Sequence, residues 1–289
     1  MSEASRHPSE PQPSGPHPRT PRVKICGITD LHDAELAVAL GAWAIGMVFY
    51  AGSPRRCSTE QAQRITTALR RRVELCGVFV NPSLDELAQQ AEELGLTLLQ
   101  LHGDEGPSFC AEAARRTGAR VIKARQVSGA GDVRDLERFH VDFHLLDARA
   151  TASDDQDLRG GTGETFDWSL LEGRRSRTPL ILSGGLAPGN VAEAVERVRP
   201  YAVDTASGTE RAPGHKDEAK LRAFFAAATQ TATTPGSADR DLDGPGADAR
   251  ATPATAAQTG KVQALQADPG AGGADATPVD GATVQGAAA

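Results

Sequence analysis

Strand-length apolar runs alternate with amphipathic segments eight times between Val23 and Phe225. The runs are continuous rather than alternating apolar and polar, which predicts strands buried on both faces and hence a parallel sheet covered by helices. Eight strand–helix pairs in about 200 residues predict a single closed (β/α)8 TIM barrel of the α/β class better than an open doubly wound sheet. The runs lie at 23–28, 44–49, 74–80, 97–103, 120–126, 143–148, 179–185 and 201–208.

Helix start signals support the helical half of this pattern, because polar side chains that can cap the first backbone N–H groups precede several amphipathic segments. The expected starts are Thr29 or Asp30, Ser58 with Gln61 three residues later, Ser83 with Glu86, and Pro188.

The composition changes on both sides of this region. Residues 229–289 contain mainly Ala, Thr, Gly, Pro and Asp without periodicity, so they cannot bury enough apolar surface to offset the entropy of ordering. Residues 1–21 are rich in Pro, Ser and His. We therefore predict one catalytic barrel domain at 22–228, between a disordered N-terminal tail and a disordered C-terminal tail at 229–289.

The charge balance excludes several classes of partner. The formal net charge is −7, of which residues 230–289 contribute −4, so the barrel region is nearly neutral. No basic stripe indicates a nucleic-acid or anionic membrane surface, and no apolar run is long enough to span a bilayer. Because the N-terminus lacks the pattern of a secretory signal, we expect a cytoplasmic protein.

Four cysteines occur, none at the spacing of a metal site, and a chain of this size needs no disulfides. Cys57, Cys76 and Cys110 are expected to be buried, reduced core residues. Cys26 differs because it stands where the first apolar run breaks into a turn. Asp147 ends the sixth run in the same way. At the carboxyl ends of barrel strands, this thiol and this carboxyl suggest a base and an acid.

A thiol with an ordinary pKa of about 8.5 is only slightly ionised at neutral pH. Cys26 could act as a base if its surroundings lower this pKa. Lys24 lies on the same side of the predicted strand as Cys26, and the sequence leaves open whether it reaches the thiol.

Glycines and serines follow the seventh and eighth runs. Gly184 and Gly185, with Ser207 and Gly208, could present backbone N–H groups to a phosphate. Glycines at strand ends are also ordinary turn formers. The presence of both loops after the last two strands favours a phosphate site.

Three further residues end strands or follow them. Arg55 could hold a carboxylate or phosphate through its forked donors, or could be a solvated surface residue. His102 could contact a substrate or satisfy a polar loop. Asp204 could bind a sugar hydroxyl or hold the loop that carries Ser207.

Eight short motifs occur in order between about Val23 and Phe225: KICGIT, GMVFY followed by SPR, GVFVN, LQLHGDE, LLD, GGTGETFDW, LSGGL, and AVDTASG with the later PGHKD. Each motif is weak alone, but eight in this order are specific. Together they resemble the phosphoribosylanthranilate isomerase family of tryptophan biosynthesis.

The resemblance implies an Amadori rearrangement of N-(5-phosphoribosyl)anthranilate to 1-(2-carboxyphenylamino)-1-deoxyribulose 5-phosphate, without metal or cofactor. It implies Asp147 as general acid, Cys26 as general base and Arg55 as the ligand of the anthranilate carboxylate. It assigns the phosphate to the two glycine loops. The implied partner is a small sugar phosphate, and the enzyme is expected to be a monomer or homodimer.

Three departures and three rival hypotheses remain. Arg56 stands where the family more often has an aromatic residue. The loop from Arg149 to Arg159 is longer and more acidic than the family pattern, and the C-terminal tail has no counterpart in it. The first rival is the histidine-pathway isomerase, a family with two catalytic aspartates and an internal half-barrel repeat. The second is indoleglycerol-phosphate synthase, which has an extra N-terminal helical segment. The third is a barrel that binds a phosphate ligand without turnover.

Overall fold

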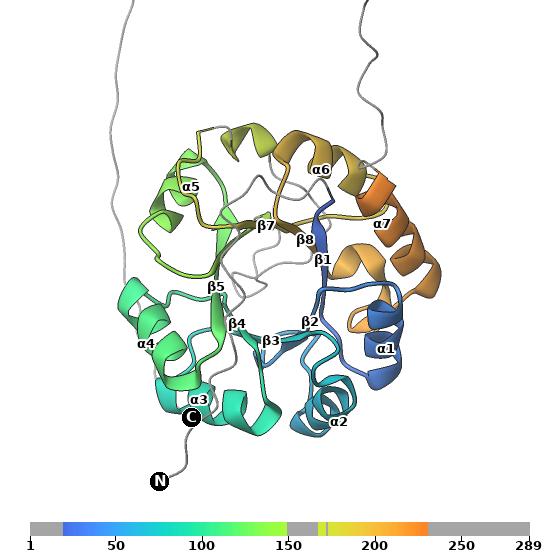
Figure 1. Ribbon diagram of the computed structural model, residues 1–289. Coiled ribbons are helices and arrows are strands. Elements are labelled where there is room, and N and C mark those ends of the chain that lie inside the picture. The colour runs from blue at the N-terminus through green and yellow to red at the C-terminus, as the bar shows by residue number, and fades with distance from the viewer. Residues whose placement is uncertain (1–19, 149–166, 172, 231–289) are drawn as a thin grey trace, which may run out of the picture. The chain divides into compact units, whose positions relative to one another are not determined.

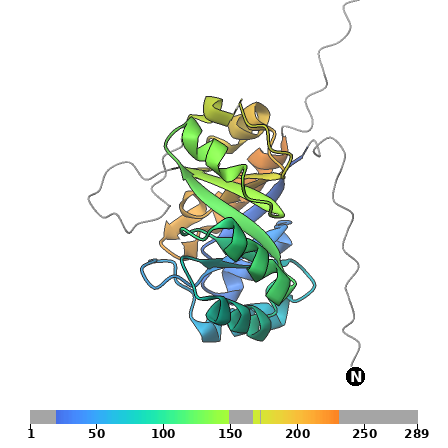
Figure 2. The same cartoon turned by 90° about the vertical axis from the view of Figure 1, so that its left-hand side faces the viewer.

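The computed structural model describes residues 20–148, 167–171 and 173–230. Eight parallel strands close into a barrel in sequence order, with the helices outside it (Figure 1). Figure 2 shows the strands crossing the barrel obliquely, as closure of a sheet requires. The predicted TIM barrel is confirmed. The strands are β1 (Arg22–Cys26), β2 (Ala44–Val48), β3 (Glu74–Phe79), β4 (Leu98–Leu101), β5 (Arg120–Val127), β6 (Phe143–Ala148), β7 (Leu180–Leu182) and β8 (Ala202–Thr205).

Every strand begins within one residue of its predicted run, but six of the eight end one to three residues earlier. The difference has a local cause. Gly27 follows β1 with φ of 72°, and Gly184 follows β7 with φ of 90°. Such left-handed backbone cannot continue a strand, so these residues belong to the loops at the carboxyl end of the barrel.

Most helices start where the sequence predicts. The Asp30 side chain accepts a hydrogen bond from the N–H of Asp33, and Ser83 forms a capping box with Glu86. The sixth helix starts after Asn190 rather than at Pro188, because the Asn190 side chain holds residues 187–190 in a turn. The helices are α1 (Leu31–Ala39), α2 (Thr59–Leu69), α3 (Leu84–Leu94), α4 (Pro107–Thr117), α5 (Ala130–Leu136), α6 (Val191–Val198) and α7 (Glu218–Gln230).

The prediction of a helix after β6 is wrong for the described residues. There, only a short 3-10 helix, η1 (Trp168–Leu171), lies between β6 and β7. A second one, η2 (Ser207–Thr209), follows β8. It leads into a hairpin of β9 (Glu210–Ala212) and β10 (His215–Lys216) before α7. The last helix, α7, runs to Gln230, two residues past the end at 228 that the sequence predicts for the barrel domain.

Aromatic side chains close the amino-terminal end of the barrel. Trp43 contacts Phe143 and Tyr201 edge-on, with ring centroids 5.5 and 5.7 Å away, and the Arg22 guanidinium lies over the Trp43 and Tyr201 rings. Above them, Leu98, Ile122, Leu145 and Ile181 are among the residues that fill the interior. This packing leaves the carboxyl end of the barrel for polar residues.

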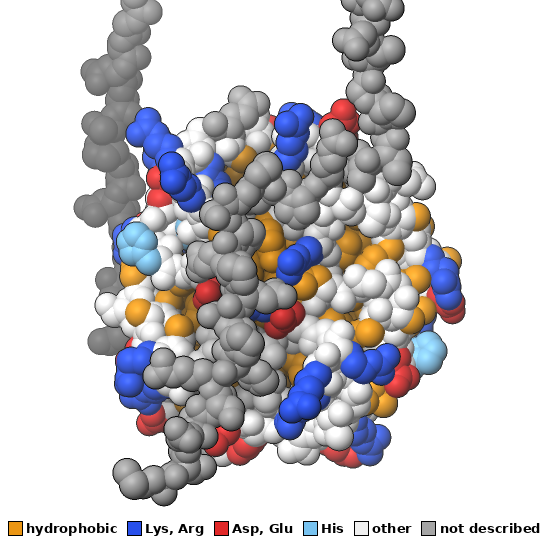
Figure 3. Space-filling model, in the orientation of Figure 1, with side chains coloured by type: hydrophobic (Ala, Val, Ile, Leu, Met, Phe, Trp, Pro, Cys, Tyr) orange, Lys and Arg blue, Asp and Glu red, His pale blue; other side chains and the backbone are white. Residues whose placement is uncertain are grey.

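Several predictions concern residues outside the described part: most of the tail at 1–21, the 149–163 loop, and the C-terminal tail beyond residue 230. No helix in the described segments is long and apolar enough to cross a membrane. On the face in Figure 3, the Lys and Arg side chains of described residues are scattered among acidic and uncharged ones.

Candidate active site

A cavity of about 860 Å³, its open mouth included, lies at the carboxyl end of the barrel. Its walls come from strands on opposite sides of the ring and from the loops that follow them. All but one of the predicted site residues line it. These are Cys26, Arg55, His102, Asp147, Gly184, Gly185, Asp204 and Ser207.

Gly208 is the exception. A Cβ at this position would collide with the carbonyl oxygen of Leu186. Gly208 therefore allows the loop after β8 to pack directly on the loop after β7, and it brings the two predicted phosphate loops together instead of lining the cavity.

Asp147 lies near the end of β6 and is 6% exposed. Its Oδ2 is 3.6 Å from Nε2 of His102, which follows β4. Gln100 contacts the other ring nitrogen of His102 at 3.4 Å. A carboxyl beside an imidazole, at the wall of a cavity, can donate a proton and recover it.

Cys26 ends β1 beside a buried ion pair. Nζ of Lys24 is 2.7 Å from Oδ1 of Asp204, and the Ser183 hydroxyl donates to Oδ2 of Asp204 at 3.1 Å. Burial lowers the pKa of Lys24, but Asp204 and the neighbouring thiols outweigh it, so this pKa is raised and Lys24 is charged. Asp204 thus contacts Lys24 and Ser183 directly.

The structure answers whether Lys24 reaches the thiol. Burial raises the pKa of Cys26, while the charge of Lys24 and its hydrogen bond to the thiol oppose this rise. The net pKa lies above the ordinary value, so the surroundings do not lower it as a base would need. Cys26 is therefore a neutral thiol at pH 7 in the free protein.

The other cysteines are buried and reduced. Burial raises the pKa of Cys57 to about 11, that of Cys76 to about 12 and that of Cys110 to about 11. Their expected burial is confirmed.

The loop after β7 suits an anion. Gly184 and Gly185 have φ of 90° and 64°, and no described residue accepts a hydrogen bond from either backbone N–H. Ser207 also lines this cavity. Successive N–H groups in such a turn form a concavity that binds phosphate.

Arg55 does not face the cavity alone. Its Nε lies 3.0 Å from each carboxylate oxygen of Glu210, and its Nη2 lies 2.9 Å from Oε2. Glu210 in turn contacts Nζ of Lys216 at 3.0 Å. Sequence analysis gave no role to Glu210 or Lys216. No periodicity or spacing singles out either residue, because glutamate and lysine in a loop are usually exposed.

The family model described as N-(5'phosphoribosyl)anthranilate (PRA) isomerase matches residues 23–227. The N-(5'-phosphoribosyl)anthranilate isomerase of Citrifermentans bemidjiense is 46% identical over 211 residues, which cover 73% of this chain and 98% of that protein.

Solved structures agree. The crystal structure of phosphoribosyl anthranilate isomerase from Thermotoga maritima is 42% identical, has a TM-score of 0.65, and is matched over 72% of this chain and 98% of its own. A phosphoribosyl anthranilate isomerase in complex with reduced 1-(o-carboxyphenylamino)-1-deoxyribulose 5-phosphate is also 42% identical, with a TM-score of 0.62 and the same coverage.

Proposed function

Because the chain belongs to the N-(5'-phosphoribosyl)anthranilate isomerase family, we propose that its cavity converts N-(5-phosphoribosyl)anthranilate into 1-(2-carboxyphenylamino)-1-deoxyribulose 5-phosphate by general acid and base catalysis. The chain is an isomerase of tryptophan biosynthesis. The match to this family supports none of the three rival hypotheses. Two of them are other enzyme families, and the third is a barrel without turnover.

Asp147 is the proposed general acid. Its proton goes to the ribose ring oxygen, the bond from that oxygen to C1 breaks, and the lone pair of the anthranilate nitrogen forms the C1=N bond of a protonated Schiff base. The position of Asp147 in the cavity wall, 3.6 Å from His102, supports this role. His102 can return a proton to the carboxylate after the ring has opened.

Cys26 is the proposed general base. It removes the proton from C2, and the electrons of that bond move to C1–C2 while those of C1=N return to nitrogen. The enol formed tautomerises to the ketone. The cationic Schiff base favours a thiolate nearby, as do Lys24 and Lys216, whose charges lower the pKa of Cys26 against burial.

The remaining residues hold the substrate. Arg55 is the proposed ligand of the anthranilate carboxylate, and the N–H groups of Gly184 and Gly185 with Ser207 are proposed to bind the phosphate. Asp204, which contacts Lys24 and Ser183, is proposed to position this wall of the cavity and to meet a sugar hydroxyl.

One observation carries the proposal: Cys26 and Asp147 come from β1 and β6, which are not neighbours in the barrel, yet both line one cavity. The test follows the loss of phosphoribosylanthranilate fluorescence with the substrate generated in place. Cys26→Ala and Asp147→Asn should each lower kcat by about 10²–10⁴-fold, with unchanged thermal unfolding. Cys57→Ala, a buried thiol outside the cavity, is the matched control and should stay near wild type. Normal turnover by either of the first two variants would refute its role.

A further inference from the structure

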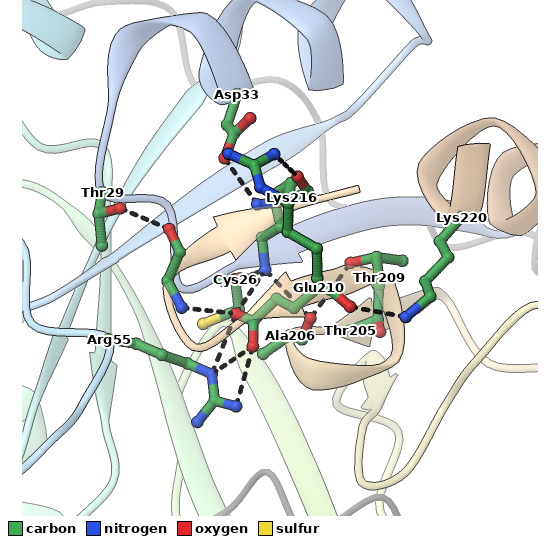
Figure 4. Close-up of polar contacts among 12 residues, drawn as sticks. Cys26, Thr29, Asp33, Arg55, Thr205, Ala206, Thr209, Glu210, Lys216 and Lys220 are labelled. Carbon is green, nitrogen blue, oxygen red and sulfur yellow. Dashed lines mark hydrogen bonds and ion pairs between the residues drawn. The ribbon is translucent and has the colours of Figure 1, made fainter. Parts of the chain in front are cut away.

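Three ionisable side chains form a chain between the cavity and the body of the protein. Arg55 stands at the cavity wall, Glu210 lies behind it, and Lys216 lies behind Glu210 (Figure 4). Their side chains are 13%, 4% and 0% exposed, in that order. One carboxyl group therefore lies between two basic side chains. Burial lowers the pKa of Lys216 below its ordinary value, although the contact with Glu210 opposes this.

The Glu210 carboxylate is fully occupied. Oε1 accepts from Nε of Arg55, from Nζ of Lys216 at 3.0 Å and from the backbone N–H of Gly214 at 3.3 Å. Oε2 accepts from Nε and Nη2 of Arg55. A carboxylate with this many donors has one orientation, and it fixes the plane of the guanidinium that it faces.

The backbone around Glu210 is shaped to admit this contact. A Cβ at Gly27 would lie 2.9 Å from Cδ of Arg55 and 3.3 Å from Oε1 of Glu210. Only a glycine leaves room there, directly after Cys26. On the other side, the Thr29 hydroxyl donates to the carbonyl of Gly214 at 2.5 Å and ties the β9–β10 hairpin to the end of β1.

Lys216 joins the same elements. Its Nζ donates to the carbonyl oxygens of Cys26 at 2.6 Å and Ala206 at 3.1 Å, and to Glu210. Its own N–H donates to Asp33 at 2.7 Å. All three ammonium protons therefore have acceptors, and Glu210 is anchored to both the first and the last strand of the barrel.

We propose that Glu210, anchored by Lys216, is a positioning residue that turns the free Nη1 edge of Arg55 toward the substrate's anthranilate carboxylate. This inference rests on the proposed function, in which Arg55 binds that carboxylate. Nε and one edge of Nη2 are held by Glu210, and no described residue forms a hydrogen bond or ion pair with Nη1.

Charge and orientation predict opposite results when Glu210 is neutralised. If Glu210 only lowers the positive charge of the site, its removal should tighten the binding of a carboxylate. If Glu210 orients Arg55, its removal releases a flexible side chain and weakens that binding. A buried ion pair is rarely retained for stability alone, because desolvation offsets its attraction.

Calorimetric titration with two ligands separates these possibilities. The first is reduced 1-(o-carboxyphenylamino)-1-deoxyribulose 5-phosphate, and the second is the same molecule without its carboxylate. For Glu210→Gln, we expect the Kd of the first ligand to rise about tenfold or more, since a charge-assisted contact is misaligned, and the Kd of the second to change by less than about twofold. KM should rise more than kcat falls.

Glu210→Gln leaves Lys216 charged and buried, which could unfold the protein. The double variant Glu210→Gln/Lys216→Met removes both charges, and its folding is checked by thermal unfolding. The matched control is Glu105→Gln/Lys123→Met, because Lys123 and Glu105 form another buried pair, at 2.7 Å, and do not line the cavity. This control should lose stability but keep the affinity ratio of the two ligands.

Each outcome decides the proposal. A selective loss for the carboxylate ligand in both Glu210 variants supports it. Tighter binding, unchanged binding or an equal loss for both ligands overturns it. Arg55→Met distinguishes the failures. If this variant weakens binding of only the ligand with the carboxylate, and the Glu210 variants do not, the positioning role of Glu210 is refuted while the role of Arg55 stands. If Arg55→Met changes neither affinity, the assignment of Arg55 fails, and the positioning proposal fails with it.

Discussion

Gly46, on β2 beside β1, is the strand position where an added methyl group would meet the thiol of Cys26. A Cβ built there lies 2.9 Å from Sγ of Cys26, 3.3 Å from Cα of Cys26 and 3.3 Å from Nζ of Lys24. Ordinary contacts between such atoms are about 3.5–4.0 Å, so in Gly46→Ala the thiol must retreat by roughly 0.6–1.1 Å or rotate to another rotamer. Either movement takes Sγ away from its present position.

The expected cost has two parts. Overpacking a buried site of this kind destabilises by about 1–3 kcal/mol, which leaves a protein of ordinary stability folded. Misplacement of a reacting group by about 1 Å lowers turnover by roughly 10²-fold. In Gly46→Ala, kcat should therefore fall by a much larger factor than the fraction of folded protein does.

The matched control is Gly77→Ala on the neighbouring strand β3. Its Cβ would lie 2.6 Å from Leu96 and 2.6 Å from Phe79, in the layer between barrel and helices. Urea unfolding should show that Gly77→Ala loses as much stability as Gly46→Ala or more. The kcat of its folded fraction should nevertheless equal that of wild type. Wild-type kcat in Gly46→Ala, with the loss of stability present, would refute the argument that the position of the thiol sets the rate.

Three further predictions concern other parts of the molecule. His144 is buried with Nε2 2.9 Å from the carbonyl of Phe139, and burial lowers its pKa to about 4. Because this pKa is below the unfolded value near 6.5, the contribution of His144 to stability is full above about pH 6.5 and falls by roughly 3 kcal/mol as the pH drops to 4. Urea unfolding should show this pH dependence in wild type and in the exposed-residue control His140→Gln, and should lose it in His144→Gln. Gly184→Ala, at φ of 90°, should raise KM about tenfold with a small change in kcat, and equal losses in both would contradict phosphate binding at this turn. Removal of residues 231–289 should leave kcat and KM unchanged in the same fluorescence assay, because their composition gives no core, and a large loss of activity would show that they contribute to the barrel.

The sequence predicts those features that depend on residues near one another in the chain. Continuous apolar runs mark strands, and Ser83 with Glu86 marks a helix start, because both signals act over a few residues. Cys26 and Asp147 could be singled out since parallel topology brings all carboxyl strand ends to one edge. The short 3-10 helix before β7 could not be predicted, because its apolar residues give the same pattern as one turn of an α-helix.

The Arg55–Glu210–Lys216 chain was beyond prediction for a different reason. Glu210 lies 155 positions after Arg55, and Lys216 is buried although lysine is usually exposed. Their contact depends on the β9–β10 hairpin folding back on β1, and on the space left by Gly27. Neither condition is visible as periodicity or spacing. From the sequence, a buried and paired charged residue in a loop therefore looks the same as a solvent-exposed one.

The raised pKa of Cys26 bears on how a thiol can act as the base. Burial and Asp204 hold the thiol neutral in the free protein, while Lys24 and Lys216 oppose them. Each lysine is already paired with a carboxylate, Lys24 with Asp204 and Lys216 with Glu210, and a neighbouring carboxylate opposes the effect of its lysine on the thiol. The balance changes when a cation enters the cavity, and the proposed Schiff base is such a cation, formed beside C2 only after the acid has opened the ring. In the proposed mechanism the thiol therefore ionises only at the step that needs the base. A neutral thiol reacts more slowly than a thiolate with oxidants.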